Sequence, residues 1–162
     1  MKAIVVYESL WGNTAAIARA IASGIGPDAA ALSTTAATGA ALADADLIVA
    51  GAPLLGFSLP TDQMRDSIKT SPGAGPSAPD FSHTSLRSWL ASLPAGGGRF
   101  AAFETRLRFS PGSATKDIES GLKRAGYRPA AESERFIVKG KYGPLRDGEL
   151  ERAGAWGKSL AR

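Results

Sequence analysis

A short segment near the start of the chain combines hydroxyl and amide side chains with a glycine. Ser9, Gly12, Asn13 and Thr14 follow directly on the apolar run Ala3–Tyr7, and a helical pattern of apolar residues begins at about Asn13. The start of a helix offers unpaired N–H groups and the positive end of the helix dipole, which together bind a phosphate without a cation. The glycine lets the backbone approach a ligand closely. The segment therefore predicts a cradle for a phosphate monoester.

Other motifs for phosphate, metal or thiol chemistry are missing from the sequence. It contains neither the G-x-x-x-x-G-K-[ST] pattern of a P-loop nor the G-x-G-x-x-G pattern of a dinucleotide site. The absence of cysteine excludes disulfides, iron–sulfur ligation and thiol nucleophiles. A single histidine, His83, cannot form a multi-histidine metal site.

Apolar runs alternate with helical patterns along the chain, which indicates an α/β fold with a parallel sheet. We expect strands at Lys2–Tyr7, Asp28–Ser33, Asp46–Ala50, Arg99–Phe103 and Phe136–Val138. We expect helices at about 13–24, 36–43, 86–93 and 113–125, and a last helix capped by Asp147.

Five strands with crossover helices predict a doubly wound parallel sheet of order 2-1-3-4-5, with helices on both faces and one domain over residues 1–162. Ligands of such sheets bind outside the carboxyl ends of strands 1 and 3. The phosphate segment follows strand 1 and is therefore expected at this point. The segment Ser71–Ser85 is rich in Pro, Gly and Ser and predicts a long surface loop. We predict that His83, within it, is exposed to solvent; the alternative is a proton donor folded over the site.

The sequence resembles the flavodoxin family in four segments that follow one another in the family's order. The segment "VVYESLWGNTAAIA" is similar to the first strand, phosphate loop and first helix, in which the loop hydroxyl-x-x-G-x-[ST] binds the phosphate of FMN. The segments "DLIVAGAPLLGF" and "FAAFETR" resemble the strands and loops that contact the flavin ring. The end of the chain, "GKYGPLRDGELERAGAWGKSLA", resembles single-domain bacterial flavodoxin-like proteins.

The resemblance implies FMN as the cofactor and a set of residues around it. The phosphate would be held by Ser9, Leu10, Trp11, Gly12, Asn13 and Thr14. The dimethylbenzene and N5 side of the ring would be lined by Pro53, Leu54, Leu55, Gly56 and Phe57, and the N1–O2 edge by Glu104, Thr105 and Arg106. The chain departs from the family because leucines replace the aromatic residues that commonly sandwich the ring. Only Phe57 and Phe109 offer a ring nearby.

The positive charge of the chain is concentrated in its second half. The formal net charge is +4; residues 1–98 carry 5 Lys/Arg and 7 Asp/Glu, whereas residues 99–162 carry 14 and 8. Lys139, Lys141 and Arg146 follow the last strand and are expected on the rim of the site. They predict an acidic redox partner protein or an acidic small substrate; ordinary solvated charge is the alternative. Stacking aromatics are sparse there, which disfavours nucleic acid.

Three functions follow from the resemblance. The first is an electron carrier that uses FMN. The second is an FMN-dependent oxidoreductase acting on a quinone-like or carboxylated substrate, as in flavodoxin-like protoporphyrinogen oxidases, and the third is a cofactor-free interaction module. The sequence identifies no catalytic residue. It shows neither a secretory leader nor an apolar stretch of roughly 20 residues, so we expect a cytoplasmic protein without a membrane span.

Overall fold

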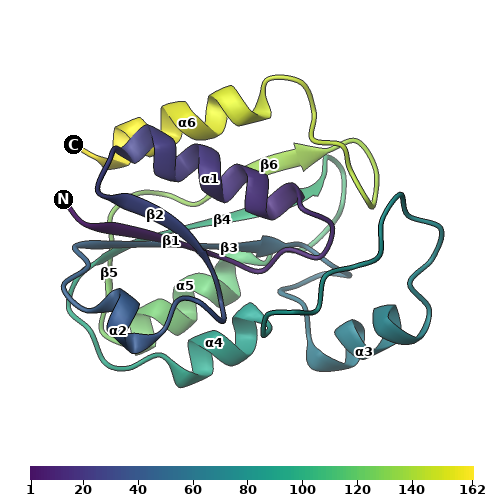
Figure 1. Ribbon diagram of the computed structural model, residues 1–162, viewed down its shortest axis with the longest axis horizontal. Helices are drawn as coiled ribbons and strands as arrows, with labels where there is room; N and C mark the ends of the chain where they lie inside the picture. Colours follow the sequence, from purple (N-terminus) through teal and green to yellow (C-terminus); the bar gives the residue numbers. More distant parts are fainter.

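The computed structural model describes all residues, 1–162, and contains one parallel sheet of order β2-β1-β3-β4-β5, with β6 also paired to β4 (Figure 1). The strands are β1 Ala3–Tyr7, β2 Ala29–Ser33, β3 Leu47–Pro53, β4 Arg99–Leu107, β5 Arg128–Pro129 and β6 Glu134–Val138. The helices are α1 Asn13–Ile25, α2 Gly39–Leu42, α3 Asp62–Thr70, α4 Leu86–Ser92, α5 Thr115–Arg124 and α6 Glu149–Leu160. The predicted fold class and strand order are confirmed.

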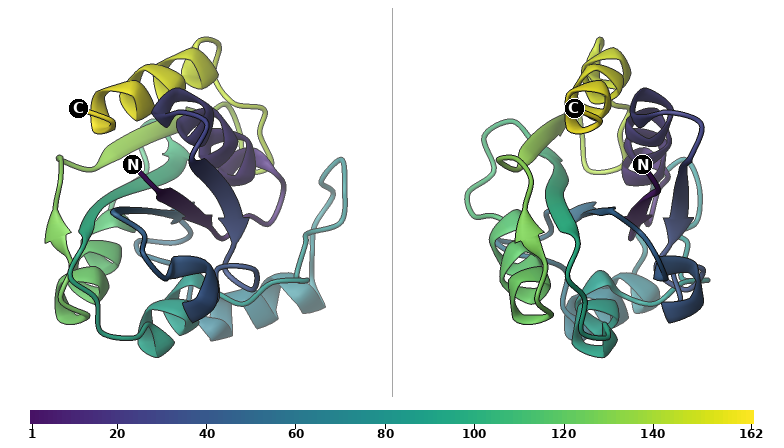
Figure 2. Two further views of the ribbon diagram at one scale, coloured as in Figure 1. Left: turned by 60° about the vertical axis from the view of Figure 1, so that its left-hand side comes forward. Right: turned by 90° about the vertical axis from the view of Figure 1, so that its left-hand side faces the viewer.

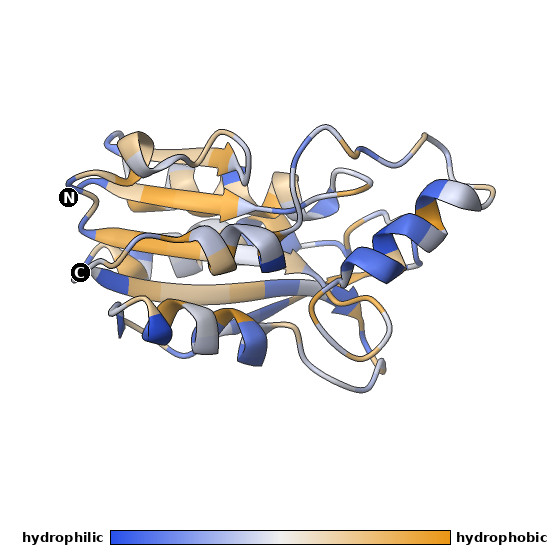
Figure 3. Cartoon of the chain, turned by 90° about the horizontal axis from the view of Figure 1, so that it is seen from below, coloured by the Kyte–Doolittle hydropathy of each residue, from blue (hydrophilic) through white to orange (hydrophobic).

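Helices cover both faces of the sheet, and each face has its own apolar core (Figure 2). On one face α1 and α6 pack on the sheet through residues such as Ile17, Ile21 and Leu160. On the other face α4 and α5 bury Leu86 and Ile118 among other apolar side chains. Because the central strands are covered twice, they are apolar along nearly their whole length (Figure 3).

The fifth strand of the prediction is divided into two pieces. β5 pairs with the start of β4 at Arg99 and Phe100, and β6 pairs with its end at Phe103–Leu107. Pro129 has no N–H group and interrupts the ladder. The prediction Phe136–Val138 therefore covered only the second piece. This piece carries the chain to the carboxyl edge of the sheet, where the candidate site lies.

Helix α3 was not predicted. Thr61 caps its start, where the Thr61 hydroxyl accepts a hydrogen bond from the N–H of Met64 at 3.2 Å. The helix is mostly hydrophilic (Figure 3) and buries only Arg65 and Ile68, so it gives almost no apolar periodicity. It lies beyond the carboxyl edge of the sheet and leads into the segment 71–85 (Figure 1).

The last helix begins at a different residue from the one predicted. Gly148 is its N-cap, with φ +86°, and the Asp147 side chain makes no capping bond. Asp147 instead forms an exposed ion pair with Lys139 at 3.4 Å. No helix of the structure combines the length and the apolar character needed to cross a membrane.

Candidate functional site

A cavity of about 250 Å³ lies at the carboxyl ends of β1, β3, β4 and β6. Eleven of the residues proposed from the sequence line it: Ser9, Leu10, Trp11, Asn13, Thr14, Pro53, Leu54, Leu55, Gly56, Thr105 and Arg106. The cavity therefore unites the three segments that the sequence analysis placed around one ligand. Its volume is near the lower end of the range for small-molecule sites, roughly 300 Å³ and above.

Three of the proposed residues do not line the cavity, and four others do. Gly12, Phe57 and Glu104 lie outside its lining. The four other lining residues are Leu107, Ser110, Val138 and Lys141. The sequence analysis placed Lys141 on the rim of the site but missed the other three. Val138 ends β6, so the rule that ligands bind at carboxyl ends, which placed Lys141 on the rim, could have been extended to Val138. Leu107 and Ser110 were missed because β4 is longer than predicted.

The segment Ser9–Thr14, here called the phosphate loop, is closed by the Ser9 hydroxyl. Its Oγ accepts hydrogen bonds from the N–H groups of Gly12 at 3.2 Å and Ala15 at 3.1 Å. Gly12 has φ +92°, a left-handed conformation that favours glycine. No group of the protein accepts from the N–H groups of Trp11, Asn13 and Thr14. These three donors at the start of α1 are therefore free to bind an anion.

The Trp11 side chain adds a fourth donor. Its Nε1 is buried and has no hydrogen-bond partner within the protein. The ring packs edge-on against Tyr142, with 5.0 Å between ring centroids. A buried donor without a partner costs about 1–3 kcal/mol. Trp11 both lines the cavity and carries this unpaired donor.

Two side chains of the phosphate loop connect it to neighbouring elements. The Thr14 hydroxyl lies 2.8 Å from the Thr105 hydroxyl on β4. The Asn13 amide donates to the Tyr142 carbonyl at 3.2 Å. The N–H of Leu54 in turn donates to the Thr105 carbonyl at 2.8 Å. These bonds fix the ends of β3 and β4 and the segment after β6 around the start of α1.

Glu104 and Arg106 lie inside β4, not in the loop that follows it. Glu104 is fully buried, and its carboxylate accepts from the N–H groups of Ala114 and Thr115 at 3.1 and 3.2 Å, close to the start of α5. The Arg106 guanidinium pairs with this carboxylate at 3.0 Å and also donates to the Gly112 carbonyl. Arg106 lines the cavity with a charge that Glu104 partly neutralises.

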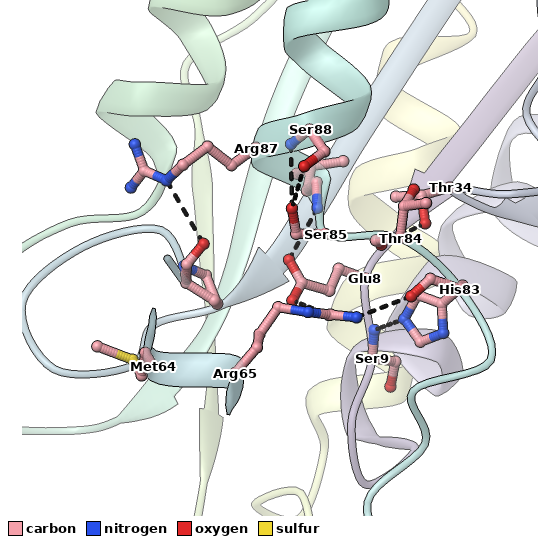
Figure 4. A network of polar contacts seen from close by, with 12 residues as sticks. Glu8, Ser9, Thr34, Met64, Arg65, His83, Thr84, Ser85, Arg87 and Ser88 are labelled. Atoms are coloured by element: carbon pink, nitrogen blue, oxygen red, sulfur yellow. Dashed lines mark hydrogen bonds and ion pairs between the residues drawn. The ribbon is translucent and has the colours of Figure 1, made fainter. Parts of the chain in front are cut away.

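The prediction of an exposed His83 is wrong. Only 5% of the residue is exposed, and its Nε2 accepts a hydrogen bond from the N–H of Ser9 at 3.0 Å (Figure 4). Nearby, the Arg65 guanidinium pairs with Glu8 at 2.6 Å and donates to the His83 carbonyl at 2.8 Å. Glu8 also accepts from the N–H of Leu86 at 2.9 Å. This network fixes α3 and α4 to the base of the phosphate loop.

The rim of the cavity is both apolar and cationic. Leu107 and Phe109 are 40% and 89% exposed, and Phe57 is 71% exposed. Leu107 and Phe109 line a groove beside the cavity together with Arg108, Lys139 and Arg146. Arg146 pairs with Glu149 at 3.1 Å, whereas Arg108 stacks over the Phe109 ring. Large exposed apolar side chains next to a cavity are typical of contact surfaces.

No family model matches the sequence, and no curated protein matches it as a relative. Solved structures do match. A flavodoxin from the domain Archaea has a TM-score of 0.68 at 24% identity, over 99% of this chain and 96% of that one. Flavodoxin 2 from Bacillus cereus, in its oxidised form, has a TM-score of 0.69 at 17% identity, over 99% and 98%.

A larger protein contains a similar region. The Flv1 flavodiiron core from Synechocystis has a TM-score of 0.62 at 21% identity, over 99% of this chain but 35% of that one. The likeness to these structures extends over nearly the whole chain. The chain has the flavodoxin-like fold.

Proposed function

We propose that the protein binds FMN in this cavity and transfers electrons through it. The observation that carries the proposal is the set of unpaired backbone donors at the cavity, the N–H groups of Trp11, Asn13 and Thr14. This donor set suits a phosphate ester, and the flavodoxin-like fold suits a flavin. The residues present therefore fit the group.

The residues of the chain divide between the two parts of the cofactor. The phosphate loop would hold the phosphate through its free N–H groups and the hydroxyls of Ser9 and Thr14. Leu54 and Leu55 would line the apolar side of the ring, and Thr105 and Arg106 its polar edge. When bound, FMN supplies a ring that accepts and returns one or two electrons.

The protein's own groups would tune and shield this ring. Arg106 favours negative charge at the polar edge, while Glu104, at 3.0 Å from it, limits this effect. The aliphatic walls formed by Leu54, Leu107 and Val138 would shield part of the bound ring from water. No lysine or arginine lies in the phosphate loop, although Lys141 lines the same cavity.

The partner would be an acidic redox protein that docks on the apolar and cationic rim. Leu107 and Phe109 offer apolar contact, and Arg108, Lys139, Lys141 and Arg146 offer the positive charge. A rim of this kind steers an anionic partner toward the exposed edge of the site. The same groove also suits a small carboxylated or quinone-like substrate, so an FMN-dependent oxidoreductase is the second candidate.

Electron transfer to small charged probes tests the carrier role. Reduced, FMN-loaded protein is mixed with ferricyanide, which is anionic, or with hexaamminecobalt(III), which is cationic, over a range of salt concentrations. We expect the rate with ferricyanide to fall as salt rises, and the rate with the cobalt complex to rise.

A matched pair of variants locates the effect on the rim. Lys139→Gln with Lys141→Gln removes two charges there and should weaken the salt dependence with ferricyanide. Lys123→Gln with Arg124→Gln removes two exposed charges at the end of α5, on the side of the sheet where the strands begin. This pair should change the salt dependence of the ferricyanide rate less. Equal effects of the two pairs would contradict the docking proposal.

A further inference from the structure

The segment Ser71–Ser85, here called the strap, connects α3 to α4 and contacts the phosphate loop at two points. The Ser9 N–H donates to Nε2 of His83 at 3.0 Å, and the Asp80 N–H donates to the Leu10 carbonyl at 2.8 Å. Both bonds reach consecutive residues at the start of the phosphate loop. The strap therefore fixes the backbone from which the anion-binding N–H groups project.

The hydrogen bond to Ser9 defines the form of the His83 ring. Because Nε2 accepts this bond, the ring is neutral and its proton is on Nδ1. Nδ1 lies 3.9 Å from the Asp80 carboxylate. If Nε2 were also protonated, its N–H and that of Ser9 would face each other at the 3.0 Å between the two nitrogens, and the bond to Ser9 would be lost.

Charged groups around His83 come from three elements. Asp80 lies on the strap itself. Arg65 on α3 donates to the His83 carbonyl, and Glu8 after β1 pairs with Arg65 (Figure 4). The Tyr7 ring lies edge-on at 6.5 Å between centroids. Burial lowers the pKa of His83 below 6.5, the Asp80 carboxylate opposes this, and the Arg65 guanidinium adds to it. The neutral ring is therefore the form present near pH 7, and acidification produces the cation.

We propose that His83 is a positioning residue for the phosphate loop: its neutral ring holds Ser9 in place, and protonation releases the strap and weakens phosphate binding. The inference rests on the proposed function for its ligand, but the contact between His83 and Ser9 is independent of any ligand. The fold thus couples the affinity of the site to pH through a residue that does not itself line the cavity.

Nuclear magnetic resonance of the FMN-free protein tests the coupling directly. His83 is the single histidine of the chain, so its imidazole signals are assigned without ambiguity. We expect the amide signals of Ser9 and Asp80 to shift with the same midpoint as the His83 ring. Below it, their protection against hydrogen exchange, taken relative to the intrinsic exchange rate at each pH, should fall. A Ser9 amide that does not respond while His83 titrates would overturn the proposal.

The affinity for FMN, measured at about pH 7.5 and about pH 5.5, tests the consequence. The FMN phosphate itself loses charge near pH 6, so part of any weakening on acidification is independent of the protein. His83→Gln supplies the control because its side-chain oxygen accepts a hydrogen bond at both pH values. Acidification from about pH 7.5 to about pH 5.5 should raise the FMN dissociation constant of both proteins. We expect the factor of increase to be at least about fivefold larger for the parent than for His83→Gln.

The possible results separate this inference from the proposed function. Equal pH dependence of the parent and His83→Gln would overturn the coupling even where FMN binds both. Absence of FMN binding at both pH values would overturn the proposed function and the pH effect on binding. The response of the Ser9 amide would then still decide whether His83 positions the loop. If His83→Gln did not fold, the same amide titration of the parent would decide it.

Discussion

The Arg106 guanidinium lies 3.0 Å from the Glu104 carboxylate, and both side chains are buried on the same face of β4. The Glu104 carboxylate also accepts hydrogen bonds from the N–H groups of Ala114 and Thr115 near the start of α5. It therefore connects the wall of the candidate site to the helix behind it. Removing one member leaves the other as a buried charge without its partner.

The first prediction concerns the stability of this pair. Glu104→Gln and Arg106→Gln are each expected to lower the free energy of unfolding by roughly 3 kcal/mol, because breaking a buried ion pair costs about 3–5 kcal/mol. The double variant should lose clearly less than the sum of the two. Urea denaturation measures all three variants, with Glu119→Gln on α5, a half-buried residue that forms no ion pair, as the control. Additive losses would show that the two charges do not depend on each other.

A second prediction concerns Gly56 in the loop after β3. Its φ is +63°, and an added Cβ would lie 2.8 Å from Cε of Met64. Gly56→Ala should lower the free energy of unfolding by about 1 kcal/mol through backbone strain, and also weaken FMN binding because Gly56 lines the cavity. Gly148→Ala is the matched control, since Gly148 also has a positive φ but no neighbour within 4 Å. Equal FMN affinity in both variants would show that Gly56 serves only the turn.

A third prediction uses Glu149, which fixes the start of α6 to β6. Its carboxylate accepts from the N–H of Ile137 at 2.6 Å and pairs with Arg146 and Arg152. Although burial opposes ionisation, the hydrogen bonds and the two guanidinium groups lower the pKa of Glu149 from 4.5 to about 2. The folded state thus binds the proton more weakly than the unfolded chain, so the stabilisation is complete above pH 4.5 and is lost as the pH falls to about 2.

Glu149→Gln should therefore lower the free energy of unfolding by roughly 2 kcal/mol at neutral pH, because it removes charge-assisted hydrogen bonds, and by much less near pH 2. Denaturation across this pH range measures the difference. Glu151→Gln, an exposed residue in the first turn of the same helix, is the control. A loss that is the same at both ends of the range would contradict the assigned ionisation.

The fourth prediction is the effect of His83 on stability. Because burial lowers the pKa of His83 below 6.5, its neutral form stabilises the fold above pH 6.5, and this stabilisation declines as the pH falls below that value. His83→Gln carries no titrating group. Between pH 7 and pH 5 the parent should lose more unfolding free energy than His83→Gln. Parallel stability curves for the two proteins would contradict this.

The sequence predicted the strand order and the phosphate loop because apolar runs and a hydroxyl-rich turn are local signals. Glu104 and Arg106 were assigned to a loop since charged residues rarely lie in a buried strand; the structure shows that they satisfy each other. His83 was assigned to solvent because its partner, the Ser9 N–H, is 74 positions away in the chain. Helix α3 was missed because its packing relies on Arg65 and few apolar residues. Long-range polar contacts of this kind leave no periodicity to recognise.

The central claim is that the phosphate loop binds the phosphate of FMN, and a comparison of FMN with riboflavin by titration calorimetry tests it most directly. Two or more charge-assisted bonds to the phosphate should make FMN bind at least about 30-fold more tightly than riboflavin. Thr14→Ala should reduce this ratio, whereas Thr70→Ala, at the exposed end of α3, should preserve it. Equal affinities for FMN and riboflavin, or no binding of FMN at about 0.1 mM, would contradict the account.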